Sequence, residues 1–390
     1  MSQKALLTEI QFILKSLCRI AAKPPWPFLK INPPDFQNLD WQKVIEIGQT
    51  HRVLGFVAFA LEEEDVFKNL KPELQLDLAK ILMQTECENR SRMDQFKTVS
   101  HLFAQKNIPI IPLKGIDLSL RVYRDMPFRQ MGDLDVLVRV NDLTQASQCL
   151  WDHGFHLKKF RTKNRWQDSI RFDPDKPLEK HASGRASFEK EGLDVDLHWS
   201  PRYQVGGHEI QMALKRAWTE SRLCPGLGEE QIRVLSPEDA ACHLTLHTAE
   251  MYNPSLIQIL DLALMMNLLG NQAAEIILSR LPIPAESSRI KIEILLKDVQ
   301  TIFKAGGASE RLIQFFILHK PSEFYRKEWI PEADLSIRLR SPVNRLLYGL
   351  GYFFPNPEYY GSKKGFAQYG VHWKNLAIGV RRRLKEKLAG

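Results

Sequence analysis

The chain has 390 residues, of which 44% are hydrophobic and 26% are charged, a composition typical of an ordinary soluble protein. Its formal net charge is +8, but +7 of that lies in residues 361–390, which argues against a nucleic-acid groove along the whole body. The five cysteines are far apart and form no C-x-x-C pair, so a disulfide scaffold and a zinc ribbon are both disfavoured.

Charged residues interrupt every apolar run near the N-terminus. They are Lys4, Glu9, Lys15 and Arg19. No run there reaches the length of a signal peptide or of a membrane span. With the cysteine pattern, this predicts a cytoplasmic protein without a transmembrane segment.

Helical patterns dominate the first hundred residues. Apolar residues recur at helical spacing in 2–22. Asp40 is placed to cap a second helix, and Pro72 begins a much longer one that ends near Lys106. We therefore predict an N-terminal helical region over 1–106.

Extended and helical segments then alternate. The segment 108–113 is predicted to be a short strand whose prolines favour the edge of a sheet. Further strands are expected at 134–140, 185–190 and 193–199, with helices at 116–124 and 142–152. This order predicts an α/β core of modest size over 107–235.

Helices return after this core. Ser236 to Asp239 combine a hydroxyl cap, a proline and two acids, which is a strong helix start. Helices are expected at 237–250 and 255–269. The helical pattern continues to residue 350, so we predict a C-terminal helical domain over 236–350 and an aromatic and basic tail over 351–390.

The tail contains a predicted amphipathic helix. Its apolar residues Leu376, Val380, Leu384 and Leu388 recur every four positions, opposite Arg and Lys. That pattern fits peripheral binding to an anionic membrane surface, or binding to an acidic partner. A plain solvated terminal helix explains it equally well.

Carboxylates mark two of the predicted strands. Asp133 and Asp135 precede an apolar, β-branched run, and alternation along a strand places both on one side. Asp194 and Asp196 share one face of a later strand. Together the strands can present three or four carboxylates to one pocket, although a solvated strand end is the alternative. Such oxygen ligands suit Mg²⁺, and two ions about 3.5–4 Å apart are usual in nucleotidyl transfer.

Four motifs point to one family. They are Leu-Lys-Gly at 113–115, Arg129 with Gly-Asp-Leu-Asp-Val-Leu-Val at 132–138, Val-Asp-Leu-His-Trp at 195–199, and Leu-Ser-Pro-Glu-Asp at 235–239. In order and spacing they resemble the bacterial uncharacterised nucleotidyltransferases of the DNA polymerase beta-like superfamily, over about residues 40–270. The resemblance implies an α+β fold, with a small mixed-sheet core flanked by N-terminal and C-terminal helical regions. It also implies two Mg²⁺ ions that hold a nucleoside triphosphate.

The resemblance assigns the catalytic and metal-binding roles. Asp133 and Asp135 are expected to hold both Mg²⁺ ions against the triphosphate. Asp196 is expected to be the third ligand and to help deprotonate the attacking hydroxyl. We prefer Asp196 to Asp194 because it stands two residues before the histidine, as the acid of the family motif does.

Four further residues are expected to contact the nucleotide. Lys114 and Gly115 take the place of the usual Gly-Ser pair, before a helix whose amides can receive phosphate; a simple turn is the alternative. Arg129 suits bidentate phosphate binding, or a structural ion pair. His198 either orients the acceptor or a carboxylate, or is a buried strand histidine.

Two histidines have the spacing of zinc ligands. His243 and His247 lie four residues apart on a predicted helix. No H-E-x-x-H arrangement and no nearby cysteine completes such a site. Packing and capping on the helix is therefore the preferred explanation.

These observations predict a Mg²⁺-dependent nucleotidyltransferase. It is expected to transfer a nucleoside monophosphate from a triphosphate, with ATP as the expected donor, and to release pyrophosphate. The acceptor stays open among small molecules, peptides, proteins and RNA. The alternatives are a non-catalytic nucleotide-binding or regulatory protein on the same fold, and another phosphoryl-transfer enzyme such as a kinase.

Overall fold

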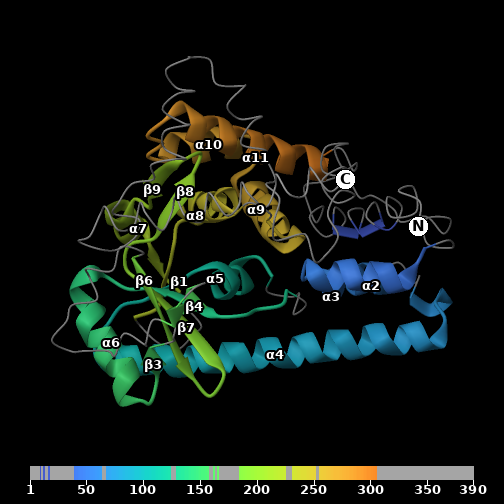
Figure 1. Cartoon of the computed structure of the whole chain (residues 1–390), viewed down its shortest axis with the longest axis horizontal. Helices are drawn as coiled ribbons and strands as arrows, with labels where there is room; N and C mark the ends of the chain where they lie inside the picture. The colour runs from blue at the N-terminus through green and yellow to red at the C-terminus, as the bar shows by residue number, and fades with distance from the viewer. Residues whose placement is uncertain are drawn as a thin grey trace.

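The structure is a computed structural model. It describes residues 39–63, 67–123, 129–157, 184–224, 231–251 and 254–304, with short pieces at 9, 12–13, 16–17, 161–162 and 165–166. The predicted first helix lies mostly outside the described residues, and the aromatic and basic tail lies wholly outside them. The fold is α+β, as predicted: a mixed sheet lies among helices, with α4 along one edge of the molecule and α10 and α11 along the opposite edge (Figure 1).

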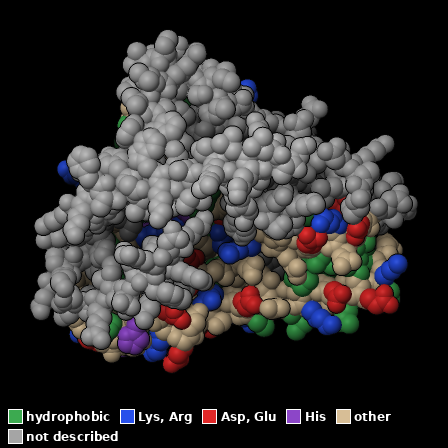
Figure 2. Space-filling view, viewed as in Figure 1, with side chains coloured by type: hydrophobic (Ala, Val, Ile, Leu, Met, Phe, Trp, Pro, Cys, Tyr) green, Lys and Arg blue, Asp and Glu red, His purple; other side chains and the backbone are tan. Residues whose placement is uncertain are grey.

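The N-terminal helices are α2 (Trp41–Thr50), α3 (Leu54–Glu63) and α4 (Pro72–Ala104), with the short η2 (Phe67–Asn69) between α3 and α4. Asp40 caps α2 as predicted, because its side chain accepts a hydrogen bond from the Lys43 amide at 3.1 Å. Pro72 begins α4, also as predicted, and this helix is 33 residues long. Charged side chains of both signs follow the edge of the molecule where α4 runs (Figure 2).

Five strands form the central sheet, in the order β1-β2-β7-β6-β3. They are β1 (Ile111–Pro112), β2 (Leu134–Leu137), β3 (His156–Leu157), β6 (Arg185–Lys190) and β7 (Leu193–His198). β2 and β7 are parallel, whereas the other pairs are antiparallel. β1 lies at an edge, as its prolines predict.

The two faces of β2 and β7 differ sharply. On one face Leu134, Val136 and Val195 are fully buried. They share a hydrophobic core with Phe96 of α4 and Leu150 of α6 (Leu143–Asp152). The opposite face carries carboxylates. The predicted alternation is therefore confirmed: burial of the apolar face turns the polar residues to the other side of the sheet.

The sequence analysis assigned no element between residues 200 and 234, yet the structure places several there. They are β8 (Arg202–Val205), β9 (His208–Gln211), α7 (Leu214–Glu220), β10 (Arg222–Leu223) and β11 (Arg233–Val234); β4 (Arg161–Thr162) and β5 (Arg165–Trp166) form a separate pair. Gly206 and Gly207 turn the β8–β9 hairpin with positive φ, and such a Gly-Gly pair is a hairpin signal. Ser287 and Ser288 donate hydrogen bonds to its backbone at 2.8 and 2.7 Å.

Four helices complete the described chain: α8 (Pro237–Glu250), α9 (Leu256–Leu269), α10 (Ala273–Arg280) and α11 (Glu286–Lys304). Ser236 caps α8 as predicted, accepting a hydrogen bond from the Asp239 amide. No single described helix is long and apolar enough to cross a membrane. The bent pair α9 and α10, at 101° to each other, reaches that length and composition together.

The described residues form two hydrophobic cores. The first joins α2 and α3 to α8, α9 and α11, so the N-terminal and C-terminal helices share one interior. The second lies under the sheet. α4 contributes Leu78 to the first core and Phe96 and Phe103 to the second. The domain boundaries at 106 and 235 stay a prediction, but the two helical regions pack as one body.

His51 joins the α2–α3 corner to α9. Its side chain is buried, and its Nδ1 accepts a hydrogen bond from the Leu256 amide at 3.2 Å. Its carbonyl accepts another from the Ile257 amide at 3.4 Å. Burial lowers the pKa of His51 from 6.5 to about 4, so the ring is neutral at pH 7 and Nδ1 is free to accept.

We expect His51 to make stability depend on pH. Because its pKa is lower in the folded state, the unfolded chain takes up a proton first as pH falls. The contribution is present above pH 6.5 and is lost as pH falls toward 4. At about 1.4 kcal/mol per pKa unit, this amounts to about 3 kcal/mol.

Denaturant melts between pH 7.5 and 4.5 measure this effect. His51→Asn keeps an acceptor for the Leu256 amide but has no proton to gain. Its free energy of unfolding is expected to fall less with pH than that of the wild type. The difference between the two curves isolates His51 from His243 and His247, whose pKa values burial also lowers. Parallel curves would contradict the assignment.

Candidate active site

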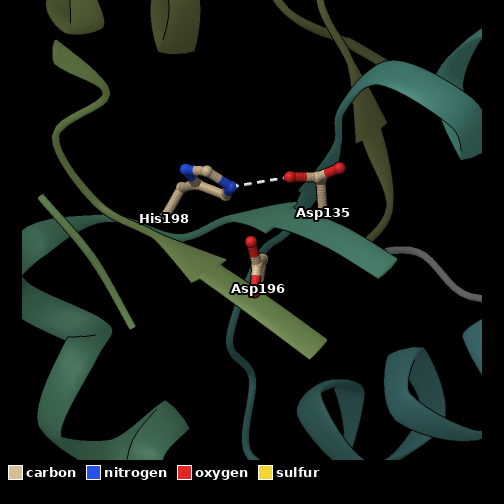
Figure 3. Close-up of side chains that lie close together, drawn as sticks. All are labelled: Asp135, Asp196 and His198. Atoms are coloured by element: carbon tan, nitrogen blue, oxygen red, sulfur yellow. Dashed lines mark hydrogen bonds and ion pairs between the residues drawn. The ribbon is translucent and has the colours of Figure 1, made fainter. Parts of the chain in front are cut away.

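Asp135 and Asp196 lie side by side in the sheet. They are opposite residues of the parallel pair β2 and β7, and both are buried. With His198 they form a group whose ligand atoms all lie within 4.8 Å of one another. In Figure 3 these three side chains gather on one side of the two strands. The structure thus brings together the two predicted carboxylate strands.

Asp135 is held by two cationic or proton-donating groups. One of its oxygens accepts from Lys114 Nζ at 2.6 Å and contacts His198 Nε2 at 2.8 Å. Burial alone would raise the pKa of Asp135, but Lys114 and His198 outweigh it and hold that pKa well below its usual value. Asp135 is therefore charged. His198 is a buried histidine of β7 that contacts this carboxylate, which agrees both with an orienting role toward a carboxylate and with the buried strand histidine that the sequence left as the alternative.

Asp133 is placed differently from Asp135. It lies just before β2, is exposed, and faces an open cleft. Protein atoms surround it on its other sides, and this partial burial, with the charges of Asp135 and Asp196, raises the pKa of Asp133 against the effect of Lys114. The three carboxylates are thus close enough to repel one another, although Asp133 is not a member of the tight Asp135, Asp196 and His198 group.

Asp196 has a partner that the sequence analysis missed. Ser187 of β6 donates a hydrogen bond from its hydroxyl to Asp196. The two residues are opposite each other in the antiparallel β6–β7 pair, so a strand assignment with register would have found this contact. Asp194 lies two residues earlier, opposite Glu189, and is not part of the tight group.

Lys114 and Gly115 begin α5 (Lys114–Arg121), two residues earlier than predicted. Lys114 has a φ of 48°, a left-handed conformation that is uncommon for a residue with a side chain. This turn aims its ammonium at Asp135. A β-carbon on Gly115 would lie 2.9 Å from Nη1 of Arg129, so this position needs glycine for the arginine to approach.

Arg129 is bound to a carboxylate of the helical region. Its Nε and Nη2 donate to the two oxygens of Asp261 at 3.0 and 2.7 Å, and the Tyr123 hydroxyl donates to the same group at 2.8 Å. Both charged residues are buried. The structural ion pair that the sequence left as an alternative is therefore present, while the Nη1 edge lies beside Gly115.

Asp261 was not predicted as part of the site. It is the one charged residue in the largely apolar helix α9. A buried charge inside such a helix requires a partner. That requirement was the available signal, but the partner, 132 residues away in sequence, was not predictable from it.

Several of these groups border a cleft of about 410 Å³, but Asp196 and His198 are not part of its lining. Three parts of the chain form it: the α2–α3 corner, the sheet with α5, and the helices α8 and α9. The core supplies the predicted residues Lys114, Gly115, Arg129, Asp133 and Asp135. The helices supply mainly uncharged residues, among them Leu244, Thr248, Ile257 and Gln258.

The histidines of α8 pack against an aromatic ring. His243 is buried and lies edge-on to Tyr203, with ring centroids 5.9 Å apart. His247 lies edge-on to the same ring, at 6.5 Å. Burial lowers the pKa of His243 to about 3. This packing agrees with the preferred explanation.

A divalent cation fits the carboxylate face. Hard oxygen donors from Asp133, Asp135 and Asp196 suit Mg²⁺. Burial, followed by the charge of Asp135, raises the pKa of Asp133 against the effect of Lys114, so a cation at this face would favour its charged form. Since its Nε2 is engaged with Asp135, His198 acts on the carboxylate as an orienting group.

Comparison with known proteins gives one match. A family model described as uncharacterised nucleotidyltransferase matches residues 37–281, more than half of the chain. The matched segment contains the three carboxylates, the N-terminal helices α2 to α4, and Asp261 of α9. No curated protein and no solved structure matched the chain.

Proposed function

Since the chain belongs to the family of uncharacterised nucleotidyltransferases, we propose that it transfers a nucleoside monophosphate from a nucleoside triphosphate to an acceptor hydroxyl or phosphate. The observation that carries the proposal is the buried group of Asp135, Asp196 and His198, with Asp133 beside it at the cleft. ATP is the first donor to test. The family match indicates the reaction class, and the carboxylates are the groups proposed to hold the Mg²⁺ that this reaction needs.

The proposed step is an in-line displacement at the α-phosphorus. A bond forms between the attacking acceptor oxygen and phosphorus, and the bond from phosphorus to the β-phosphate oxygen breaks. Pyrophosphate leaves with that electron pair. Where the acceptor is a hydroxyl, its proton passes to Asp196, which Ser187 holds in place.

Asp133, Asp135 and Asp196 would hold Mg²⁺, which supplies neutralisation of phosphate charge and activation of the attacking oxygen. His198 would keep Asp135 oriented through the contact of its Nε2 with the carboxylate. Lys114 keeps Asp135 charged and lies at the phosphate end of the cleft. The Leu244 and Ile257 side chains on the opposite wall offer an apolar surface for the flat face of a nucleobase.

The direct test is calorimetric binding and product analysis with full-length protein. We expect ATP to bind in the presence of Mg²⁺, with much weaker binding after chelation. Labelled triphosphates, incubated with metabolite, RNA and protein fractions, should yield a labelled nucleotide adduct and pyrophosphate. Release of diphosphate would identify a kinase instead. Absence of Mg²⁺-dependent binding of any triphosphate would contradict the proposal and favour a regulatory protein on the same fold.

The two acids of β7 give a sharper prediction. Asp196→Asn is expected to abolish measurable transfer while leaving part of the triphosphate binding that depends on Asp133 and Asp135. Asp194→Asn is the matched control: it makes the same change on the same strand face, two residues away, and should cost less than about tenfold in rate. Steady-state rates with saturating ATP decide between them. The reverse order of severity would move the third-ligand role to Asp194.

A further inference from the structure

Arg52 stands at the α2–α3 corner and lines the cleft. Its backbone has a φ of 57°, a conformation that L residues adopt at a cost and that often occurs at functional sites. Two backbone hydrogen bonds hold the corner: Arg52 N donates to Gln49 O at 3.0 Å, and Val53 N donates to Gly48 O at 2.8 Å. The exposed side chain thus projects from a well-braced turn.

The guanidinium of Arg52 reaches the start of the catalytic strand. Its Nη1 lies 3.6 Å from the position that a β-carbon would take on Gly132, and Gly132 directly precedes Asp133. A larger side chain at residue 132 would touch the guanidinium. Glycine therefore leaves open space between Arg52 and the exposed carboxylate of the site.

Three basic side chains line the described cleft, and two of them are already paired. Lys114 binds Asp135, and Arg129 binds Asp261. The guanidinium of Arg52 makes no hydrogen bond or ion pair within the part of the chain that the structure describes. Among these three side chains, Arg52 can therefore bind an incoming anion without first breaking an ion pair with a carboxylate.

The corner that carries Arg52 is fixed to the rest of the site. The adjacent His51 is bonded to the first turn of α9, and Asp261 of the same helix holds Arg129. Arg52 and Arg129 are thus positioned through one helix. The backbone at Arg52 is therefore already ordered, and binding a ligand has to order only its side chain.

We propose that Arg52 binds the β- and γ-phosphates of the nucleoside triphosphate, the part that leaves as pyrophosphate. This inference rests on the proposed function. The reacting α-phosphate must lie at the buried carboxylates Asp135 and Asp196, so the remaining phosphates extend toward the exposed Asp133 and the neighbouring Arg52. A planar guanidinium matches phosphate oxygens with two parallel hydrogen bonds.

The test compares binding of pyrophosphate, ATP and AMP by calorimetry, with Mg²⁺ and full-length protein. Arg52→Ala should weaken pyrophosphate and ATP binding roughly 10- to 100-fold, the effect of losing a charge-assisted contact, and change AMP binding less than about twofold. Arg52→Lys should bind pyrophosphate and ATP more tightly than Arg52→Ala but less tightly than the wild type, because lysine keeps the positive charge and lacks the paired donors of the guanidinium. Arg90→Ala on α4 is the matched control, since Arg90 is exposed and pairs only with Glu86 among the described residues.

A second variant separates binding from folding. Arg52→Gly removes the same side chain, but glycine favours the positive φ of this corner, so its melting temperature should equal or exceed that of the wild type. It should still show the loss of pyrophosphate binding.

Three outcomes would overturn the inference. Wild-type binding to ATP with no loss in Arg52→Ala and Arg52→Gly would refute the role of Arg52 and leave the proposed function standing. An equal loss for AMP would show that the residue does not act on the terminal phosphates. A wild type that binds no ATP with Mg²⁺ would remove the proposed function itself, and this inference with it.

Discussion

Replacing either Asp133 or Asp135 with Asn is expected to lower the rate of the proposed nucleotidyl transfer roughly 10³-fold, because each change removes one of the carboxylates proposed to hold Mg²⁺, a contribution of about 4 kcal/mol to transition-state stabilisation. The same two variants should differ in stability when Mg²⁺ is absent. Asp135 is the counter-ion of Lys114 and the partner of His198. Its removal leaves a half-buried ammonium without its partner, so Asp135→Asn should melt below the wild type.

Asp133→Asn should melt at or above the wild-type temperature. Burial, followed by the charges of Asp135 and Asp196, raises its pKa against the effect of Lys114. Its charge is therefore unfavourable in the folded protein, and the substitution removes that charge. The sequence alone predicted no such difference, because it treated the two acids as equivalent. Melting curves in chelator, paired with rates in Mg²⁺, measure both effects. Near-normal transfer in both variants would overturn the metal-site assignment.

The ion pair between Arg129 and Asp261 should give the largest effect on folding. Asp261→Asn leaves a guanidinium buried without a counter-charge, and breaking a buried pair in this way typically costs about 3–5 kcal/mol. Although burial opposes it, Asp261 raises the pKa of Arg129 above its ordinary value. The variant loses that support, but the intrinsic basicity of a guanidinium keeps Arg129 charged in proteins, so it cannot escape the penalty by losing its proton. Urea unfolding followed by circular dichroism measures the loss.

Two further proteins make that experiment specific. Glu293→Gln breaks the exposed pair with Arg289 on α11 and should cost less than about 1 kcal/mol. The triple variant Tyr123→Phe, Arg129→Met, Asp261→Leu removes both buried charges and the hydroxyl bonded to them. It should recover much of the stability lost by Asp261→Asn. If the single variant were as stable as the wild type, the pair would not be buried and charged as described.

The sequence predicted best where a local rule decides the outcome. Asp40, Pro72 and Ser236 marked helix starts that the structure confirms, since caps act within one turn. Alternation along β2 and β7 predicted which residues face the core. The carboxylates of both strands meet because the strands are parallel neighbours, a pairing that the family resemblance implied and that spacing alone does not determine.

Contacts between distant segments were not predictable from the sequence. No sequence pattern around Arg129 indicates that Asp261 is its partner, and none around His51 indicates that it contacts α9. The β8–β9 hairpin was missed although Gly206 and Gly207 signalled a turn, because its short strands have no long apolar alternation. Such contacts depend on how separate elements pack, and a single sequence gives no measure of that.

The shared core of the first and last helices has a consequence for how the protein is made. α2 and α3 leave the ribosome early, but their partners α8, α9 and α11 follow some two hundred residues later; the His51–Leu256 bond closes a separation of 205 residues. Folding is slow when so long a loop must close, because the chain loses conformational entropy before the stabilising contacts form. During synthesis α2 and α3 therefore lack their partners from the last helices until those helices are made, and apolar surface left exposed over that interval favours aggregation.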